Sequence, residues 1–172
     1  MLQQMKETLL ALREYALERN LQAQLSLHRE DSHLTRLANG SVSLNTTESV
    51  TSLSVTAYGD RHTATATLVC GLKDLDMMRQ AVDRAAAMLP HASRLSFQPT
   101  LPSIPADSTC ETGYDAALAQ LGSAGILDYI SDAAAGLEDE DLTLGGSFSV
   151  GSTAWCTLST ATPHSVSWRL SD

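Results

Sequence analysis

The residues with the clearest chemical potential are two histidines, His28 and His33, with Glu30 and Asp31 between them. Zinc peptidases place two histidines one turn apart on a helix and use the glutamate that directly follows the first as general base. Here the histidines are five residues apart, the glutamate is misplaced, and the segment has the pattern of strand and turn. We therefore expect a solvated turn and no metal site, although a small metal-dependent hydrolase using His28, His33 and a cysteine is one alternative.

Other nucleophile and ligand patterns are incomplete. The three cysteines, Cys70, Cys110 and Cys156, are odd in number and widely spaced, without a Cys-x-x-Cys pair. They fit neither a disulfide framework nor a zinc ribbon, so we expect reduced, half-buried thiols in a reducing compartment. Ser152 follows Gly151 but lacks the Gly-x-Ser-x-Gly pattern of a nucleophile elbow, and the acidic run at residues 138–141 lacks the ligand spacing of a calcium loop. We expect no catalytic residue, metal ligand or cofactor in this chain.

The most informative local feature is Arg36, which lies beside the dipeptide Asn39-Gly40. Asn-Gly favours a tight two-residue hairpin turn between two strands. The planar guanidinium of an arginine can bind a carboxylate through two parallel hydrogen bonds. An ordinary surface arginine on a hairpin is the alternative that the spacing alone supports.

The elements that must position these residues come in blocks. Apolar residues at helical spacing predict helices at residues 1–20, 73–89 and 123–135, with Asp74 as an N-cap and Gly136 as a C-terminal stop. The stripes expected to face inward are Met5, Leu9, Leu12 and Ala16 in the first helix, Leu75, Met78, Val82, Ala85 and Leu89 in the second, and Ile126, Leu127, Ile130 and Ala134 in the third. Alternating residues predict strands at 21–27, 33–37, 42–44, 50–58, 63–69 and 143–158. Residues 93–112, which are rich in proline, are expected to form an extended connector.

Strands that follow one another in a block indicate an α+β fold rather than a doubly wound sheet. We expect an antiparallel sheet of about five to seven strands, packed by two or three helices. Residues 1–160 are expected to form one domain. Residues 161–172 would be a polar tail, with an exposed Trp168, or the start of a missing second half.

Composition excludes several classes of function. The formal net charge of −9 argues against nucleic acid, because phosphate binding needs a cationic face. The first twenty residues are charged and amphipathic, unlike a signal peptide, and no apolar run has membrane length. A cytoplasmic protein without a membrane or nucleic-acid partner is the expectation.

In its order of motifs the chain resembles the TldD/PmbA family, the proposed gyrase modulators regarded as metallopeptidases. The resemblance covers roughly residues 6–158 and rests on these segments: Arg36-x-Ala38-Asn39, Tyr58-Gly59-Asp60-Arg61, residues 72–87, Leu101-Pro102, Tyr114-Asp115 and residues 123–135. Each segment is short, and their order is more specific than any one of them. The family's His-Glu-x-x-x-His zinc motif and its cysteine ligand belong to a C-terminal half that this sequence does not contain, and residues 158–162 depart from the family pattern.

The resemblance implies an N-terminal domain that positions a peptide substrate and takes part in a homodimer or a heterodimer with a paralogue. Zinc and proteolysis, or peptide maturation, would belong to the missing half. We expect Arg36 and Asn39 to contribute to the peptide-binding surface. The alternative is a stand-alone interaction or scaffold domain that is not catalytic.

Overall fold

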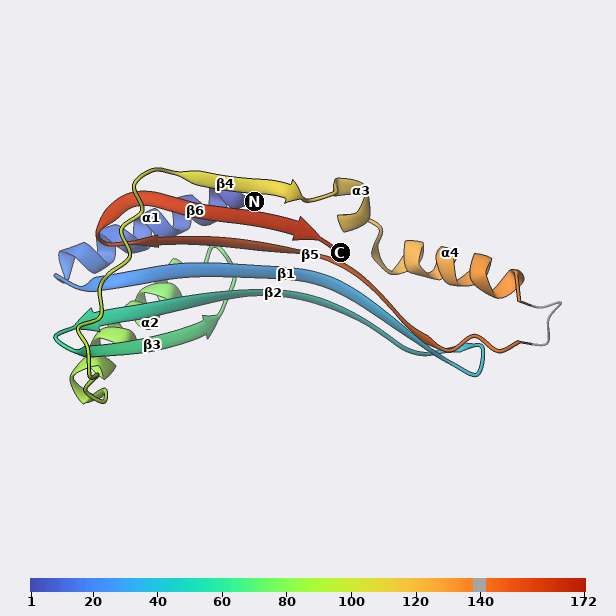
Figure 1. The fold of residues 1–172 in the computed structure, drawn as a ribbon, viewed down its shortest axis with the longest axis horizontal. Coiled ribbons are helices and arrows are strands. Elements are labelled where there is room, and N and C mark those ends of the chain that lie inside the picture. Colours follow the sequence, from blue (N-terminus) through green and yellow to red (C-terminus); the bar gives the residue numbers. More distant parts are fainter. Residues whose placement is uncertain (138–141) are drawn as a thin grey trace. The chain divides into compact units, whose positions relative to one another are not determined.

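One six-stranded sheet, in the order β3-β2-β1-β5-β6-β4, connects the described parts of the chain (Figure 1). The computed structural model describes residues 1–137 and 142–172. Its strands are β1 (Gln22–Ala38), β2 (Ser41–Gly59), β3 (His62–Val69), β4 (Ser108–Gly113), β5 (Gly146–Ser159) and β6 (Thr162–Ser171). Its helices are α1 (Leu2–Glu18), α2 (Leu75–Met88), α3 (Ala116–Ala119) and α4 (Gly122–Ala135), with the short 3-10 helix η1 (Leu89–His91). The predicted α+β class is confirmed.

The sheet is mostly antiparallel. β2 pairs with β3 from Ser52 opposite Val69 to Gly59 opposite His62. β4 is the exception, because its contacts with β6 advance in the same direction along both strands. Asp107, directly before β4, accepts a hydrogen bond from the amide of Ser165, and the hydroxyl groups of Thr109 and Ser167 are hydrogen-bonded. In both pairs the two partners are 58 residues apart in the sequence. The edge strand β4 therefore lies parallel to β6, as the arrows in Figure 1 show.

The described residues divide into two compact units. Unit 1 comprises residues 1–29, 50–110 and 154–168, and unit 2 comprises residues 30–49, 111–153 and 169–172. Every strand except β3 contributes residues to both units.

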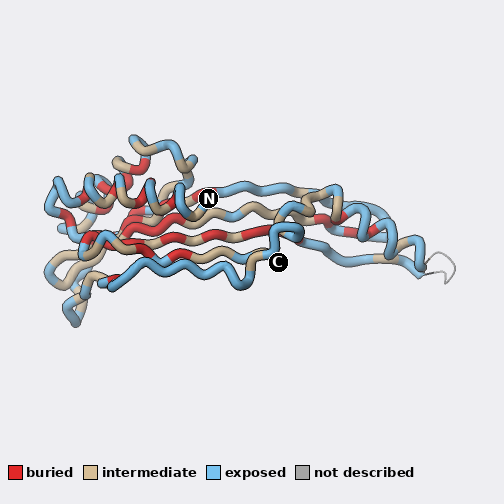
Figure 2. Tube along the Cα trace, turned by 90° about the horizontal axis from the view of Figure 1, so that it is seen from above, coloured by how far each residue is buried: buried red, intermediate tan, exposed pale blue. Residues whose placement is uncertain are grey.

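In unit 1, helices α1 and α2 and the sheet bury a large apolar core. The predicted stripe of α1 is fully buried. In the predicted stripe of α2, Met78, Val82 and Ala85 are fully buried, whereas Leu75 and Leu89 are half-buried. Along the strands, buried positions alternate with half-buried or exposed ones, which gives the red segments separated by tan or pale blue ones in Figure 2. The sheet side of the core consists of these fully buried residues: Ala23, Leu25, Leu27, Leu53, Val55, Ala57, Ala154, Cys156 and Leu158.

In unit 2, one helix provides half of the buried core residues, and the strands provide the other half. Ile126 and Ile130 of α4 pack with Leu37 and Val150, and Leu127 is 38% exposed although it was predicted to face inward. Residues four apart lie on the same face of a helix, whereas a neighbour in sequence points about 100° away, which explains the difference.

A close approach of two strands also marks unit 2. A Cβ atom added to Gly151 of β5 would lie 2.6 Å from the carbonyl oxygen of Asp31 and 3.1 Å from Cα of Ser32. These distances are shorter than real Cβ contacts, so only glycine fits between the strands here without a shift. Gly151 lies within β5, and this close contact is the structural reason for glycine at that position.

Several predicted details are wrong. The expected turn at residues 28–33 is part of the continuous strand β1, and the expected connector contains β4. Residues 162–171, for which no strand was predicted, form β6, and Trp168, which was expected to be exposed, is half-buried. These stretches were missed because polar residues of edge or half-exposed strands give no apolar alternation.

The two predicted capping residues, Asp74 and Gly136, lie at the helix ends but do not make the capping interactions that were expected. Asp74 is the N-cap residue of α2, yet its Oδ2 accepts a hydrogen bond from the amide of Gly71 at 2.7 Å instead of capping the helix. Gly136 follows α4 with an ordinary helical φ of −70°, so its position does not require glycine. The acidic run at residues 138–141 lies outside the described residues. None of the described helices combines the length and apolar character needed to cross a membrane.

Candidate functional site

The two residues predicted to bind peptide, Arg36 and Asn39, lie on the hairpin that joins β1 to β2 in unit 2. Asn39 and Gly40 have φ values of 52° and 70°, so the Asn-Gly turn is confirmed. Arg36 is exposed, and its carbonyl oxygen accepts a hydrogen bond from Ser43 Oγ at 3.2 Å. The left-handed turn explains why asparagine occupies position 39, and the role of both residues in binding stays a prediction.

The two histidines each have a local partner. The ring of His28 packs against Trp155, with ring centroids 5.4 Å apart. His33 Nδ1 lies 3.0 Å from Thr47 Oγ1 and 3.3 Å from Ser123 Oγ. Across residues 1–137 and 142–172, no group of three His, Cys, Asp or Glu side chains has the arrangement of a metal site.

The cysteines differ in exposure. Cys156 is buried, and burial raises the pKa of its thiol to about 11. Cys70 is half-buried, and its pKa is raised mainly by burial and further by the charge of Asp74. Cys110 is exposed. Because the thiolate is the reactive form, Cys156 and Cys70 are poor nucleophiles at neutral pH.

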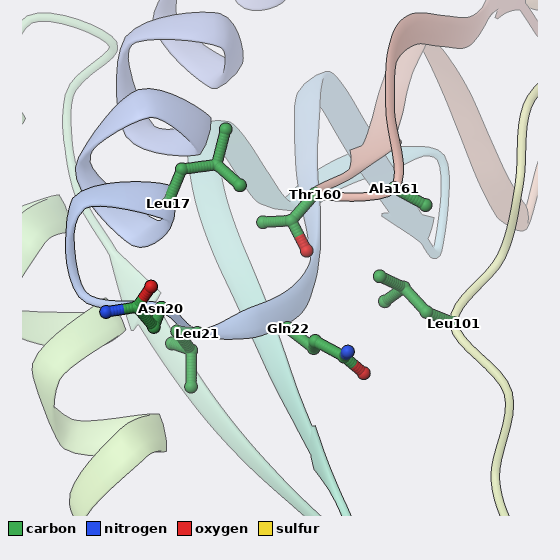
Figure 3. A pocket seen from close by; sticks show the side chains of 7 residues that line it. All are labelled: Leu17, Asn20, Leu21, Gln22, Leu101, Thr160 and Ala161. Carbon is green, nitrogen blue, oxygen red and sulfur yellow. The ribbon is translucent and has the colours of Figure 1, made fainter.

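Unit 1 has a cavity of about 420 Å³ where the end of α1 meets the turn between β5 and β6 (Figure 3). Thr160 is the best-fixed polar group there, because its Oγ1 accepts a hydrogen bond from the amide of Ala23 at 3.0 Å. None of the lining side chains is titratable, so they offer no acid, base or strong ligand. They are Leu17, Asn20, Leu21, Gln22, Leu101, Thr160 and Ala161.

A second site in unit 1 follows the outer edge of β3. Cys70 N donates to Thr51 O at 3.0 Å, which identifies a hydrogen-bonded pair at the end of the β2–β3 ladder. Hydrogen-bonded and non-hydrogen-bonded pairs alternate along an antiparallel ladder. The backbone N–H and C=O groups of Thr63, Thr65, Thr67 and Val69 therefore point away from β2. In the described part of the chain, no strand pairs with this edge.

Helix α2 runs beside this edge and forms the other wall of a groove, which we name the β3–α2 groove. Near the start of β3 the groove widens to a hollow of about 450 Å³, lined by Thr63, Ala64, Thr65, Arg84, Ala87, Met88, His91 and Ala92. Near its end lies a smaller hollow of about 130 Å³, lined by Ala66, Thr67, Leu68, Met77, Gln80, Ala81 and Arg84. Met77 and Met88 are 46% and 41% exposed, so flexible apolar side chains border both hollows.

The charge of the groove is opposite to that of the whole chain. No acidic side chain lines either hollow, whereas Arg84 lines both. Arg84 is exposed and forms no hydrogen bond or ion pair with another described residue. In a chain with a net charge of −9, this is a local cationic position beside unpaired backbone groups.

Sequence reasoning missed this groove because it depends on where α2 packs. A usable signal was present in the strand itself. The sequence of β3, His-Thr-Ala-Thr-Ala-Thr-Leu-Val, has none of the lysines or prolines with which many edge strands block pairing.

Comparisons with known proteins agree on the fold. No family model and no curated protein matches this sequence. Among solved structures, TldE from Thermococcus kodakarensis superposes with a TM-score of 0.73 at 14% identity, over 96% of this chain and 37% of TldE. A proposed modulator of DNA gyrase from Thermotoga maritima superposes with a TM-score of 0.65 at 15% identity, over 96% of this chain and 37% of that protein. Another proposed modulator of DNA gyrase, from Bacteroides thetaiotaomicron, superposes with a TM-score of 0.68 at 15% identity, over 96% of this chain and 38% of that protein.

At these identities the likeness shows the fold alone. The chain has the fold of one part of TldE and of the two proposed gyrase modulators, as the sequence resemblance implied. It spans less than two fifths of the length of these structures.

Proposed function

We propose that this chain is the N-terminal, peptide-positioning domain of a TldD/PmbA-like protein, and that it binds an extended polypeptide segment without cleaving it. The observation that carries the proposal is the unpaired edge of β3 beside α2. The likeness to TldE over 96% of this chain supports the choice of family.

The physical basis is strand addition. An extended peptide placed along β3 forms backbone hydrogen bonds with the outward N–H and C=O groups of Thr63, Thr65, Thr67 and Val69. Backbone pairing itself does not depend on the sequence of the peptide, so any selectivity must come from the side-chain hollows beside the strand. The large core of unit 1 keeps the strand and helix in place, so little ordering is needed when the peptide binds.

The chemistry of hydrolysis is left to other parts of such proteins. The sequence resemblance implies a zinc motif there, and the described residues supply no three-ligand cluster for it. We therefore assign no catalytic step to this chain. We further propose that it associates with a second copy or a paralogue in the cytoplasm, and that Arg36 and Asn39 form a second contact surface for peptide. Loss of peptide turnover in the full-length protein with Arg36→Ala is the test of that contact.

The test of the main proposal removes one outward amide. Thr67 is exposed, and its backbone N–H points away from β2, so Thr67→Pro removes a donor from the edge without breaking the β2–β3 ladder. Thr67→Val is the matched control because it keeps the amide. Binding of fluorescent unstructured peptides is measured by anisotropy, and folding of each variant is checked by circular dichroism.

We expect Thr67→Pro to weaken binding at least about tenfold and Thr67→Val to retain it, because the proline variant lacks a backbone donor and leaves a carbonyl group of the peptide without a partner. If the parent protein binds no extended peptide, the proposal is wrong. A folded partner protein captured in its place would then support the alternative of a stand-alone interaction domain.

A further inference from the structure

The β3–α2 groove has a defined sequence of sites along one strand. The hollow of about 450 Å³ lies beside Thr63, Ala64 and Thr65, and the hollow of about 130 Å³ lies beside Ala66, Thr67 and Leu68. Arg84 lines both hollows and so lies next to the middle of β3. The order along the strand is therefore a large apolar hollow, a cation and a small apolar hollow.

Strand geometry translates this order into a spacing of peptide residues. Side chains of a strand alternate between its two faces, so every second residue of a peptide paired with β3 points toward α2, about 7 Å from the next. Ala64 and Ala66 are the buried β3 residues on this face, and their small side chains leave the space beside them to a ligand. One peptide side chain enters the large hollow, and the next on the same face reaches Arg84.

We propose that this groove selects extended peptide segments with a carboxylate side chain opposite Arg84 and a large apolar side chain two residues away, at the hollow beside Thr63–Thr65. The inference rests on the proposed function and adds the class of substrate to it. A guanidinium binds a carboxylate through paired hydrogen bonds, and Met88, Ala87 and Ala92 give the large hollow an apolar lining.

The same charge disfavours a second copy of this chain as the occupant. A two-fold pairing of β3 with β3 of another copy contacts the same residues on both sides. An axis near the middle of β3 would bring the two Arg84 side chains together, where like charges repel. An acidic peptide instead neutralises Arg84.

The probe is a short serine- and threonine-rich peptide with a leucine two residues from a glutamate. The comparison peptides replace the glutamate by glutamine or lysine, or place the leucine three residues away, on the opposite face. Binding is measured at about 0.15 M salt, where the attraction of the acidic protein for basic peptides is largely screened. The protein variants are Arg84→Gln and Arg84→Glu, with Arg94→Gln as a matched control, since Arg94 is an exposed arginine outside both hollows.

We expect the glutamate peptide to bind about fivefold more tightly than the glutamine peptide, as for a partly exposed ion pair with good geometry. Arg84→Gln removes this preference, Arg84→Glu reverses it toward lysine, and Arg94→Gln leaves it unchanged. Arg84 is exposed and forms no hydrogen bond or ion pair with another described residue, and circular dichroism of each Arg84 variant separates loss of preference from unfolding.

Three outcomes overturn the inference, and they are distinguishable. Equal binding of all peptides, still lost in Thr67→Pro, rejects the charge preference but keeps peptide binding at the edge. Absence of binding by every peptide rejects both the inference and the proposed function. Dimers in sedimentation that dissociate with Thr67→Pro identify a second copy as the occupant.

Discussion

The two units share strands of one sheet, but the apolar core of unit 1 is much larger than that of unit 2. In unit 1, nineteen buried apolar residues form one cluster, because α1 and α2 both cover the sheet. In unit 2, four buried residues form the cluster, and α4 is the helix that contributes to it. Regions with few buried apolar contacts open at lower free energy than well-packed ones. The strands are therefore anchored in unit 1, where the β3–α2 groove lies, and more easily opened in unit 2.

The largest expected difference between the units concerns their cores. Leu53 of unit 1 is fully buried, and Leu53→Ala should lower the free energy of unfolding by about 4 kcal/mol. Ile130 of unit 2 is 8% exposed in a small cluster that can collapse around the gap, so Ile130→Ala should cost about 2 kcal/mol. Urea denaturation measures both values. Equal costs would show that the two cores are packed equally well.

The hairpin turn of unit 2 provides a smaller, local test. Gly40 has a φ of 70° and no atom near an added Cβ, so Gly40→Ala introduces backbone strain without a steric clash. We expect a cost of about 1 kcal/mol, since left-handed backbone disfavours residues with a Cβ. Hydrogen exchange should show faster opening near the hairpin, with unchanged protection of β3 in unit 1. Loss of protection in both units would mean that they open together.

The smallest expected effect depends on pH and belongs to unit 1. Asp107 accepts a salt bridge from Lys6 Nζ at 2.8 Å and hydrogen bonds from the amide and Oγ of Ser165, and it links the connector to α1 and β6. The hydrogen bond from Lys6, followed by that from the Ser165 amide, holds the pKa of Asp107 well below its ordinary value. A carboxyl group with a lowered folded-state pKa stabilises the fold above its unfolded pKa, and the contribution is lost as pH falls toward the folded pKa.

Asp107→Asn should therefore lower stability slightly at neutral pH. The difference in melting temperature between this variant and the parent should begin to narrow below about pH 4 and should disappear in stronger acid. Asp76→Asn is the control, because Asp76 is 91% exposed and pairs with Arg79 on the outer side of α2. Thermal melts from pH 2 to 7 test this, and a constant difference across the range would contradict it.

The sequence predicted those parts of the fold that depend on local pattern. The stripe of α1 and the Asn39-Gly40 turn are confirmed, because helical spacing and left-handed turn preference are properties of short segments. β6 and the middle of β1 were missed. There the strands are held by neighbours in the sheet, and polar residues such as Asp31 and Ser32 carry no apolar alternation.

The candidate site was less accessible to sequence reasoning than the fold. Arg36 and Asn39 were chosen from a motif, and the structure explains Asn39 by its turn. The β3–α2 groove requires Arg84 to lie beside the middle of β3, a neighbourhood that no local pattern specifies. The missing information was how one helix packs on one strand.

The packing of unit 2 depends on the absence of a side chain at Gly151. A side chain at position 151 would force β5 away from Asp31 and Ser32, and with it Val150, a quarter of the buried residues in that cluster. Since unit 1 gains no such clash, Gly151→Ala offers a way to loosen one half of the chain while the peptide groove stays assembled.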